Sequence, residues 1–293
     1  MSSAATMTRE SVDVAGKTRT FTVVEAAGPG AAPPLLLVFH GSRQTGAVHR
    51  SFTGSMFDAL AESGQAVVAY LDGHRGNWND ARKESYFPAR KDGIDDVGFA
   101  RAVVDALSGQ RRIDRSRVFA AGYSNGGQMV IRLVHEAPDL LAGAAVIAAT
   151  MPVPDNFIAT DPNPTPLPVV VIHGTKDPIV SYEGGGFPWW QRKFFKVGGL
   201  SLSAPLTAGY FAERNGITAT PTTTRLPGTA AGDPTEVEVV EYREDGRPPV
   251  ALYTVHRGGH TIPGPASVPG VLGKTSHHVN TAELIGDFFG LRD

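Results

Sequence analysis

The apolar residues of the chain gather in short runs, which polar, glycine-rich and proline-rich stretches separate. Two of these runs, PLLLVFH at 34–40 and PVVVIHG at 168–174, are nearly continuous rather than alternating. A continuous apolar run of this length is typical of a strand that is buried on both faces of a parallel sheet. Runs rich in β-branched and aromatic residues predict strands at 19–26, 34–40, 65–71, 118–124, 143–150, 168–174, 237–243 and 250–256.

Helical periodicity fills several of the intervals between these strands. In residues 95–107, apolar side chains recur on one helical face at Val97, Ala100, Val104 and Leu107. The sequence predicts further helices at 52–61, 125–136, 206–215 and 281–289. Strands that alternate with helices predict an α/β fold, with a mostly parallel central sheet and helices on both of its faces.

Composition narrows the class of protein. We expect residues 1–293 to form a single domain, and 41% hydrophobic residues suffice for a sizeable core. The 27 basic and 29 acidic residues give a net charge of −2, without the basic excess that a nucleic-acid partner requires. No apolar run is long enough to span a bilayer, so we expect no membrane partner.

Cysteine is absent from the chain, which excludes disulfides, thiolate zinc sites and a cysteine nucleophile. The first residues, MSSAATMTRESVDV, are polar and contain no apolar signal core. The expected location is therefore the cytoplasm, and a secreted protein would need a signal segment that this sequence does not contain.

The first sign of chemistry is the segment Gly122-Tyr123-Ser124-Asn125-Gly126, a G-x-S-x-G pattern. It follows the predicted strand VFAAGY and opens the predicted helix QMVIRLV, the context of a sharp turn that exposes a serine hydroxyl above a sheet. Because a serine hydroxyl is a weak nucleophile at neutral pH, Ser124 needs a base, and in this fold the chain order is serine, acid, histidine.

The acid is predicted to be Asp177, in VVVIHGTKDPIV, because a short turn separates it from the carboxyl end of a buried strand. Asp155 and Asp161, which follow the preceding strand, are the alternatives.

The base is predicted to be His260, in the segment HRGGHT, which follows the last predicted strand and precedes the final helix. Its neighbouring glycines leave room for an approach to Ser124. The alternatives are His256, within the strand, and His277 and His278, near the start of the last helix.

An acyl-transfer site also needs backbone N–H donors for the oxyanion. One donor is expected from Asn125, directly after the nucleophile, and the other from the loop HGSRQ that follows the strand at 34–40. In that loop we favour Ser42, with Arg43 as the alternative.

Residues 182–203 combine glycines with aromatic residues, among them Phe187, Trp189 and Trp190. The segment has two interpretations: a loop that packs its aromatics onto the core, or a short lid whose glycines act as hinges. If it is a lid, these aromatics bind substrate, and the substrate carries an apolar or aromatic group.

Four motifs occur in one order along the chain: HGSRQTG, GYSNGGQM, IHGTKDPIV and GGHTIPG. With GNWN at 76–79 and DDVGF at 95–99, they resemble the polyhydroxybutyrate depolymerase and feruloyl esterase-like (LpqC-like) branch of the α/β-hydrolases. The resemblance covers the chain from about residue 40 onward.

The resemblance implies an α/β-hydrolase fold, with Ser124 as nucleophile, Asp177 as acid and His260 as base. It also implies Ser42 and Asn125 at the oxyanion hole and Trp78 near the substrate pocket. Two departures are the missing cysteines and Ile262, which stands where the family often has tryptophan.

The sequence therefore predicts a serine ester hydrolase that works through an acyl-enzyme on small or oligomeric esters, without a cofactor. HRGGH has no acidic or histidine partner pattern, so no metal is expected. Thioester hydrolysis, acyl transfer or peptidase action would use the same three residues, and a binding protein on an inactive hydrolase fold is an alternative of another class.

Overall fold

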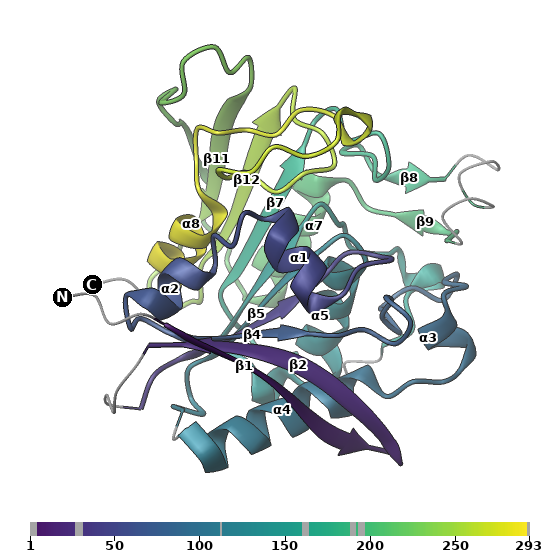
Figure 1. Ribbon diagram of the computed structural model, residues 1–293. Helices are drawn as coiled ribbons and strands as arrows, with labels where there is room; N and C mark the ends of the chain where they lie inside the picture. Colours follow the sequence, from purple (N-terminus) through teal and green to yellow (C-terminus); the bar gives the residue numbers. More distant parts are fainter. Residues whose placement is uncertain are drawn as a thin grey trace.

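The structure is a computed structural model that describes residues 5–26, 32–111, 113–159, 164–187, 192 and 197–291. Its centre is a 10-stranded sheet of order β1-β2-β4-β3-β5-β6-β7-β12-β11-β10 (Figure 1). The strands are β1 (Thr6–Val14), β2 (Lys17–Glu25), β3 (Leu35–Phe39), β4 (Val67–Leu71), β5 (Val118–Tyr123), β6 (Gly143–Ile147), β7 (Val169–Gly174), β10 (Thr222–Arg225), β11 (Glu236–Tyr242) and β12 (Val250–His256).

The sheet is parallel in its middle and antiparallel at its edges. Strands β4, β3, β5, β6, β7 and β12 pair in parallel, with Leu37 beside Ala120 and Val146 beside Val171. Antiparallel pairing of β2 with β4 and of β11 with β12 adds the outer strands. The predicted mostly parallel α/β sheet is confirmed, and all the central strands end at the same edge.

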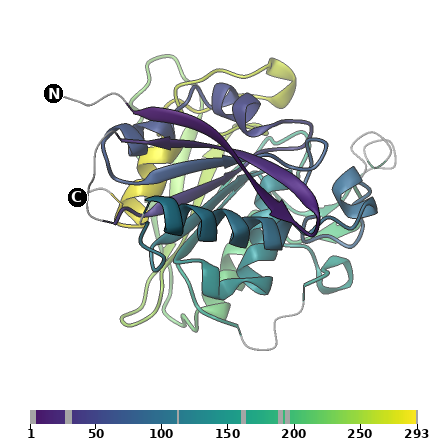
Figure 2. The same cartoon turned by 60° about the horizontal axis from the view of Figure 1, so that its bottom comes forward.

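Helices cover both faces of the sheet. Their contacts place α4 (Asp96–Arg111), α5 (Asn125–Glu136) and α7 (Ala204–Arg214) on one face, and α1 (Gly46–Phe52), α2 (Asp58–Glu62) and α8 (Thr281–Phe288) on the other. Figure 2 shows α4 lying across the first face, with the strands behind it. A short helix, α3 (Pro88–Lys91), lies within the polar, glycine-containing segment at 72–94 that connects β4 to α4.

Two apolar cores lie on the two faces because side chains alternate along each strand. In β3, Leu35, Leu37 and Phe39 belong to the core under α4 and α5, whereas Leu36 and Val38 belong to the core under α2 and α8. This division explains why the central strands are apolar at most positions.

The sequence prediction differs from the structure where backbone pairing, rather than burial, makes a strand. Strand β1 has a mostly exposed pattern and β10 a fully exposed one, so neither carries an apolar signal. Residues 53–57 of the helix predicted at 52–61 are not helical: α1 ends at Phe52 and α2 begins at Asp58, because Gly54 and Ser55 adopt positive φ angles of 63° and 59° between them.

The segment at 182–203, which the sequence left open as a packed loop or a lid, contains a small antiparallel hairpin, β8 (Gly185–Gly186) with β9 (Leu200–Ser201). Trp189 and Trp190 lie outside the described residues. Of the helices in the described ranges, none has both the length and the apolar character that a membrane crossing demands.

Candidate active site

Three of the predicted residues meet at the carboxyl edge of the sheet. Ser124 follows β5, Asp177 follows β7, and His260 lies in the loop after β12. His260 Nε2 lies 2.9 Å from Ser124 Oγ, and His260 Nδ1 lies 2.7 Å from Asp177 Oδ2. Because neighbouring parallel strands end together, residues 53 and 83 positions apart along the chain come within one hydrogen-bonded row.

The turn at Ser124 is held in a conformation that L-residues rarely adopt, with φ 55° and ψ −114°. The chain reverses so tightly that a Cβ on Gly122 would lie 2.2 Å from Gly126 O, and one on Gly126 would lie 2.1 Å from Phe39 O. The flanking glycines are therefore steric requirements of the turn. A hydrogen bond of 2.8 Å from the Ser124 N–H to Ile147 O ties the turn to β6.

The Asp177 carboxylate is fully buried and fully engaged. Its Oδ1 accepts hydrogen bonds of 2.8 Å from the N–H groups of Ile179 and Val180, and its Oδ2 faces His260. Burial alone would raise the pKa of Asp177, but the charge of His260 and the hydrogen bonds from His173 and His260 hold it well below its ordinary value. Asp177 is therefore an ionised partner for the imidazole across the neutral pH range.

Two further side chains support this row, and sequence reasoning did not single them out. The Tyr123 hydroxyl donates a 2.7 Å hydrogen bond to the backbone oxygen of His260. Burial, together with the charge of Asp177, raises the pKa of Tyr123, so the phenol stays neutral and keeps donating. His173 Nε2 lies 2.9 Å from Val180 O and 3.4 Å from Asp177 Oδ2. Both residues were hidden in the sequence because they belong to strand runs that read as core.

The loop after β3 distinguishes the two candidate oxyanion donors. The Arg43 N–H donates to Gly76 O at 2.7 Å, so it is already occupied. The Gly41 N–H donates to Gln44 Oε1 at 3.0 Å. In the ranges that the structure describes, the Ser42 N–H has no acceptor, which leaves it open to a ligand. The geometry therefore favours Ser42 over Arg43.

Neutral histidines hold this loop from behind. His40 Nε2 accepts the Gly73 N–H at 2.8 Å, so its Nδ1 is the donor in the 2.7 Å contact with Gly41 O. Burial lowers the pKa of His40 to about 4. His49 Nδ1 lies 3.1 Å from Gln44 Oε1, and burial, with a smaller effect of His40, lowers the pKa of His49 to about 3.

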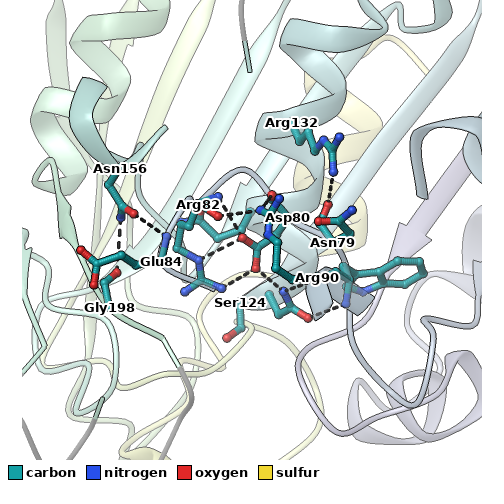
Figure 3. A network of polar contacts seen from close by, with 12 residues as sticks. Asn79, Asp80, Arg82, Glu84, Arg90, Ser124, Arg132, Asn156 and Gly198 are labelled. Atoms are coloured by element: carbon teal, nitrogen blue, oxygen red, sulfur yellow. Dashed lines mark hydrogen bonds and ion pairs between the residues drawn. The ribbon is translucent and has the colours of Figure 1, made fainter. Parts of the chain in front are cut away.

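The Asn125 side chain is locked between two residues of the 72–94 segment. Its Oδ1 accepts the Trp78 N–H at 2.8 Å, and its Nδ2 donates to Asp80 Oδ2 at 2.6 Å. Arg82 donates to the same carboxylate through Nε at 3.2 Å and Nη2 at 2.5 Å, and Arg90 donates to the backbone oxygens of Asp80 and Arg82. Figure 3 shows this network beside Ser124.

Trp78 is fully buried and packs against Phe39 and His40. Its indole N–H donates a 2.9 Å hydrogen bond to His40 O. The resemblance implies a substrate-binding residue near the pocket at this position. In the structure Trp78 lies behind the loop that follows β3, and it is not among the residues that line the two cavities beside Ser124. The family motif GNWN therefore shapes the loop rather than a cavity wall.

Two adjoining cavities open at the site. A small one of about 20 Å³ is lined by Ser124 together with Arg82, Gln128, Ala149, Thr150, Asn156, Val180, Phe187, Gly198, Gly199 and Ser201. A larger groove of about 290 Å³ runs between the Asp177–Ser181 turn and the β8–β9 hairpin, and shares Val180, Phe187 and Ser201 with the small cavity. Phe187 lines both cavities.

The alternative acids and bases lie elsewhere or outside the described residues. Asp155 is exposed in the short 3-10 helix Pro154–Asn156, and Asp161 is not described. His256 lies 3.8 Å from Glu238, His277 contacts Gly264 O, and His278 accepts the N–H groups of Thr229 and Ala230. Within the described ranges, no group of three or more histidine and carboxylate side chains could hold a metal ion.

Comparison with known proteins defines the class to which this fold and site belong. Residues 88–186 match the family described as Phospholipase/Carboxylesterase. A curated relative shares 33% identity across 97% of this chain. The chain therefore belongs to the α/β-hydrolase esterases, whose activity is that of a carboxylesterase.

That relative is named Putative esterase NocK, from Nocardia uniformis subsp. tsuyamanensis, and the match covers 83% of its length. Feruloyl esterase B from Piromyces equi is 29% identical over 78% of this chain and 40% of its own. Poly(3-hydroxyalkanoate) depolymerase C from Paucimonas lemoignei is 26% identical over 90% of this chain and 65% of its own. The predicted resemblance to feruloyl esterases and depolymerases is thereby confirmed at the level of the family.

Among solved structures, an acetyl xylan esterase from Aspergillus awamori superimposes with a TM-score of 0.64. The match covers 97% of this chain and 100% of that one at 14% identity, which shows a shared fold.

Proposed function

We propose that this carboxylesterase hydrolyses its substrate through an acyl-enzyme on Ser124, with His260 as base and Asp177 as its orienting acid. The observation that carries the proposal is the continuous row Ser124 Oγ, His260 Nε2, His260 Nδ1 and Asp177 Oδ2, with contacts of 2.9 and 2.7 Å. These distances lie within the range for proton transfer and for fixing the tautomer of the imidazole.

In the first half-reaction, Ser124 Oγ attacks the scissile carbonyl while His260 Nε2 takes its proton. The developing oxyanion accepts hydrogen bonds from the N–H groups of Ser42 and Asn125, each worth on the order of 10²-fold in rate. His260 then gives the proton to the leaving alcohol, and the ionised Asp177 stabilises the transient imidazolium. In the second half-reaction, His260 takes a proton from water as the water attacks the acyl-enzyme. His260 then returns the proton to Ser124 Oγ, and the carboxylic acid is released.

The two cavities suggest how an ester is accommodated. The groove of about 290 Å³ carries Ile179, Val180 and Phe187 and suits an apolar or aromatic group, such as a feruloyl-like or hydroxyalkanoate-like one. The small cavity of about 20 Å³ accepts only a small group. The substrate class that this favours is a small or oligomeric ester with one bulky and one compact side.

Hydrolysis of p-nitrophenyl acetate, butyrate and octanoate by the wild type, S124A and H260A tests the proposal. We expect both variants to lose about 10⁴-fold or more in kcat, because each removes a member of one catalytic unit. Ser108→Ala, on α4, is a matched serine control that should keep full activity.

Wild-type rates in S124A would overturn the assignment of the nucleophile. A wild type that cleaves only thioesters, or that transfers the acyl group to an acceptor other than water, would keep the triad and replace the reaction. A folded wild type without activity on any acyl donor would favour a binding protein on a hydrolase fold.

A further inference from the structure

Six of the eleven residues that line the small cavity beside Ser124 have polar side chains. Four of them are more than nine-tenths buried: Arg82 is 7% exposed, Gln128 5%, Asn156 4% and Thr150 0%. Arg82 comes from the 72–94 segment, Gln128 from α5 and Thr150 from the loop after β6, so three separate elements converge on one point next to the nucleophile. Figure 3 shows Arg82 and Ser124 in this region.

Two of these side chains carry polar atoms that lack a hydrogen-bond partner in the described part of the chain. They are Gln128 Oε1 and Thr150 Oγ1, and both are shielded from solvent. Buried polar atoms in folded proteins are nearly always paired, because an unpaired one loses its hydration without compensation. The two oxygens therefore indicate a bound group that the described protein atoms do not supply.

The orientation of each side chain defines the chemistry of that group. Gln128 Nε2 donates a 2.7 Å hydrogen bond to the backbone oxygen of Thr150, so Gln128 Oε1 faces away from it and can only accept. Asp80 holds the Arg82 guanidinium through Nε and Nη2, and a guanidinium can only donate. The Thr150 hydroxyl can do either.

A ligand group that satisfies this set must donate to Gln128 Oε1 and accept from Arg82. A hydroxyl does both. A carboxylate has no proton for Gln128 Oε1, and an ammonium group would lie against the Arg82 cation. The donor set therefore selects a neutral hydroxyl over either charged group.

We propose that this cavity is a subsite for a hydroxyl group that the substrate carries close to its scissile ester; the inference rests on the proposed function of Ser124. Its volume of about 20 Å³ is small enough to restrict it to a hydroxyl-sized group, and a site that holds one water needs roughly 10–15 Å³. A substrate hydroxyl would take the place of such a water and reproduce its hydrogen bonds.

Ester pairs that differ by one hydroxyl test the subsite, with acid release followed by pH-stat titration. One pair, methyl 3-hydroxybutyrate and methyl butyrate, varies the acyl side; the other, 2-hydroxyethyl butyrate and ethyl butyrate, varies the alcohol side. For each pair, the ratio of the two kcat/KM values is divided by the ratio of the two rates of hydroxide-catalysed hydrolysis, which corrects for the intrinsic reactivity of the esters. We expect the normalised kcat/KM to be about 10-fold higher for the hydroxylated member of one pair, which also identifies the side that enters the cavity.

Thr150→Val replaces the unpartnered hydroxyl by a methyl group of similar size, and we expect it to reduce this preference about 5-fold. Thr275→Val is the matched control: it removes another buried hydroxyl that has no partner among the described residues, but one that lines a different cavity. Its preference should equal that of the wild type. Gln128→Met removes the other unpartnered oxygen and should reduce the same preference, so it tests the subsite if T150V does not fold.

Equal normalised rates within both pairs, or a preference that survives both T150V and Q128M, would overturn the subsite and leave a cavity for water alone. Such a result would leave the proposed function intact, because the p-nitrophenyl panel measures that function separately. Inactivity in both panels would overturn the proposed function and the subsite with it.

Discussion

The side-chain amide of Asn125 donates a 2.6 Å hydrogen bond to the fully buried carboxylate of Asp80. Asn125 follows Ser124 directly, and its backbone N–H is the proposed oxyanion donor. The contact therefore fixes the start of α5, where that N–H is presented, to the segment that also holds the loop after β3 through Trp78. The two proposed halves of the oxyanion hole are thus connected through a single buried network.

This connection predicts the behaviour of Asn125→Ala. The variant keeps the backbone N–H but loses the contacts with Trp78 and Asp80, so we expect kcat to fall about 10-fold while KM changes little. Steady-state kinetics on p-nitrophenyl butyrate measure the effect. Asn280→Ala, which removes the side-chain cap of α8, is a control that should lower stability by about 1 kcal/mol and keep kcat. An unchanged kcat in N125A would refute the positioning role.

Asp177→Asn should lower kcat about 10⁴-fold, because an amide favours the wrong tautomer of His260. The low pKa of Asp177 also predicts that the stability of the protein depends on pH. The pKa of Asp177 is depressed in the folded state, so its charge stabilises the fold above the ordinary pKa of about 4 and loses this effect as the pH falls further.

The free energy of unfolding, measured by urea denaturation between pH 7 and pH 3, checks this second effect. The free energy of unfolding of the wild type should exceed that of D177N by a constant margin above about pH 4. Below about pH 4 this margin should shrink. Asp245→Asn, at an exposed turn position, should change neither margin nor activity. A margin that widened toward acid pH would contradict the assignment.

The buried His49 predicts a pH dependence of stability in a higher pH range than that of Asp177. Its pKa of about 3 in the folded protein lies below the ordinary value of 6.5, so the folded state binds fewer protons than the unfolded chain between these values. Stability is therefore complete above about pH 6.5 and declines as the pH falls toward 3. His49→Asn keeps a donor toward Gln44 without this titration, and its unfolding free energy should fall less steeply over that range. Parallel curves for the two proteins would exclude the effect.

The ion pair of Arg19 with Asp96 is buried, with side-chain exposures of 6% and 0% and a contact of 2.7 Å. Asp96 also accepts the Asn79 N–H at 2.7 Å, and so anchors the segment that carries Asp80. Arg19→Met leaves that carboxylate without its cation, and we expect a loss of about 3–5 kcal/mol in the free energy of unfolding. Arg101→Ala breaks the exposed pair with Asp139 and should cost less than about 1 kcal/mol. Similar losses in the two variants would contradict the role of burial.

The sequence predicted the central strands and the long helices because burial on two faces leaves a strong apolar signal. The helix Asn125–Glu136 and the strand Val250–His256 have the predicted bounds. The edge strand Thr6–Val14 left no such signal, since its pairing with Lys17–Glu25 rests on backbone hydrogen bonds that every residue except proline can make. The network around Asp80 also left no signal in the sequence, because its charged residues lie in a polar segment that resembles a solvent-exposed loop.

What the sequence by itself determined is local and chemical. The glycines around Ser124 permit a tight turn there, and the order of serine, aspartate and histidine along the chain indicates which strand ends must meet. The tertiary structure alone decided which atoms face one another: the occupied N–H of Arg43, the unpartnered oxygens of Gln128 and Thr150, and the burial of Trp78 behind the loop. Such relationships depend on distances between residues far apart in the chain, and those distances are set only when the sheet and its two cores pack together.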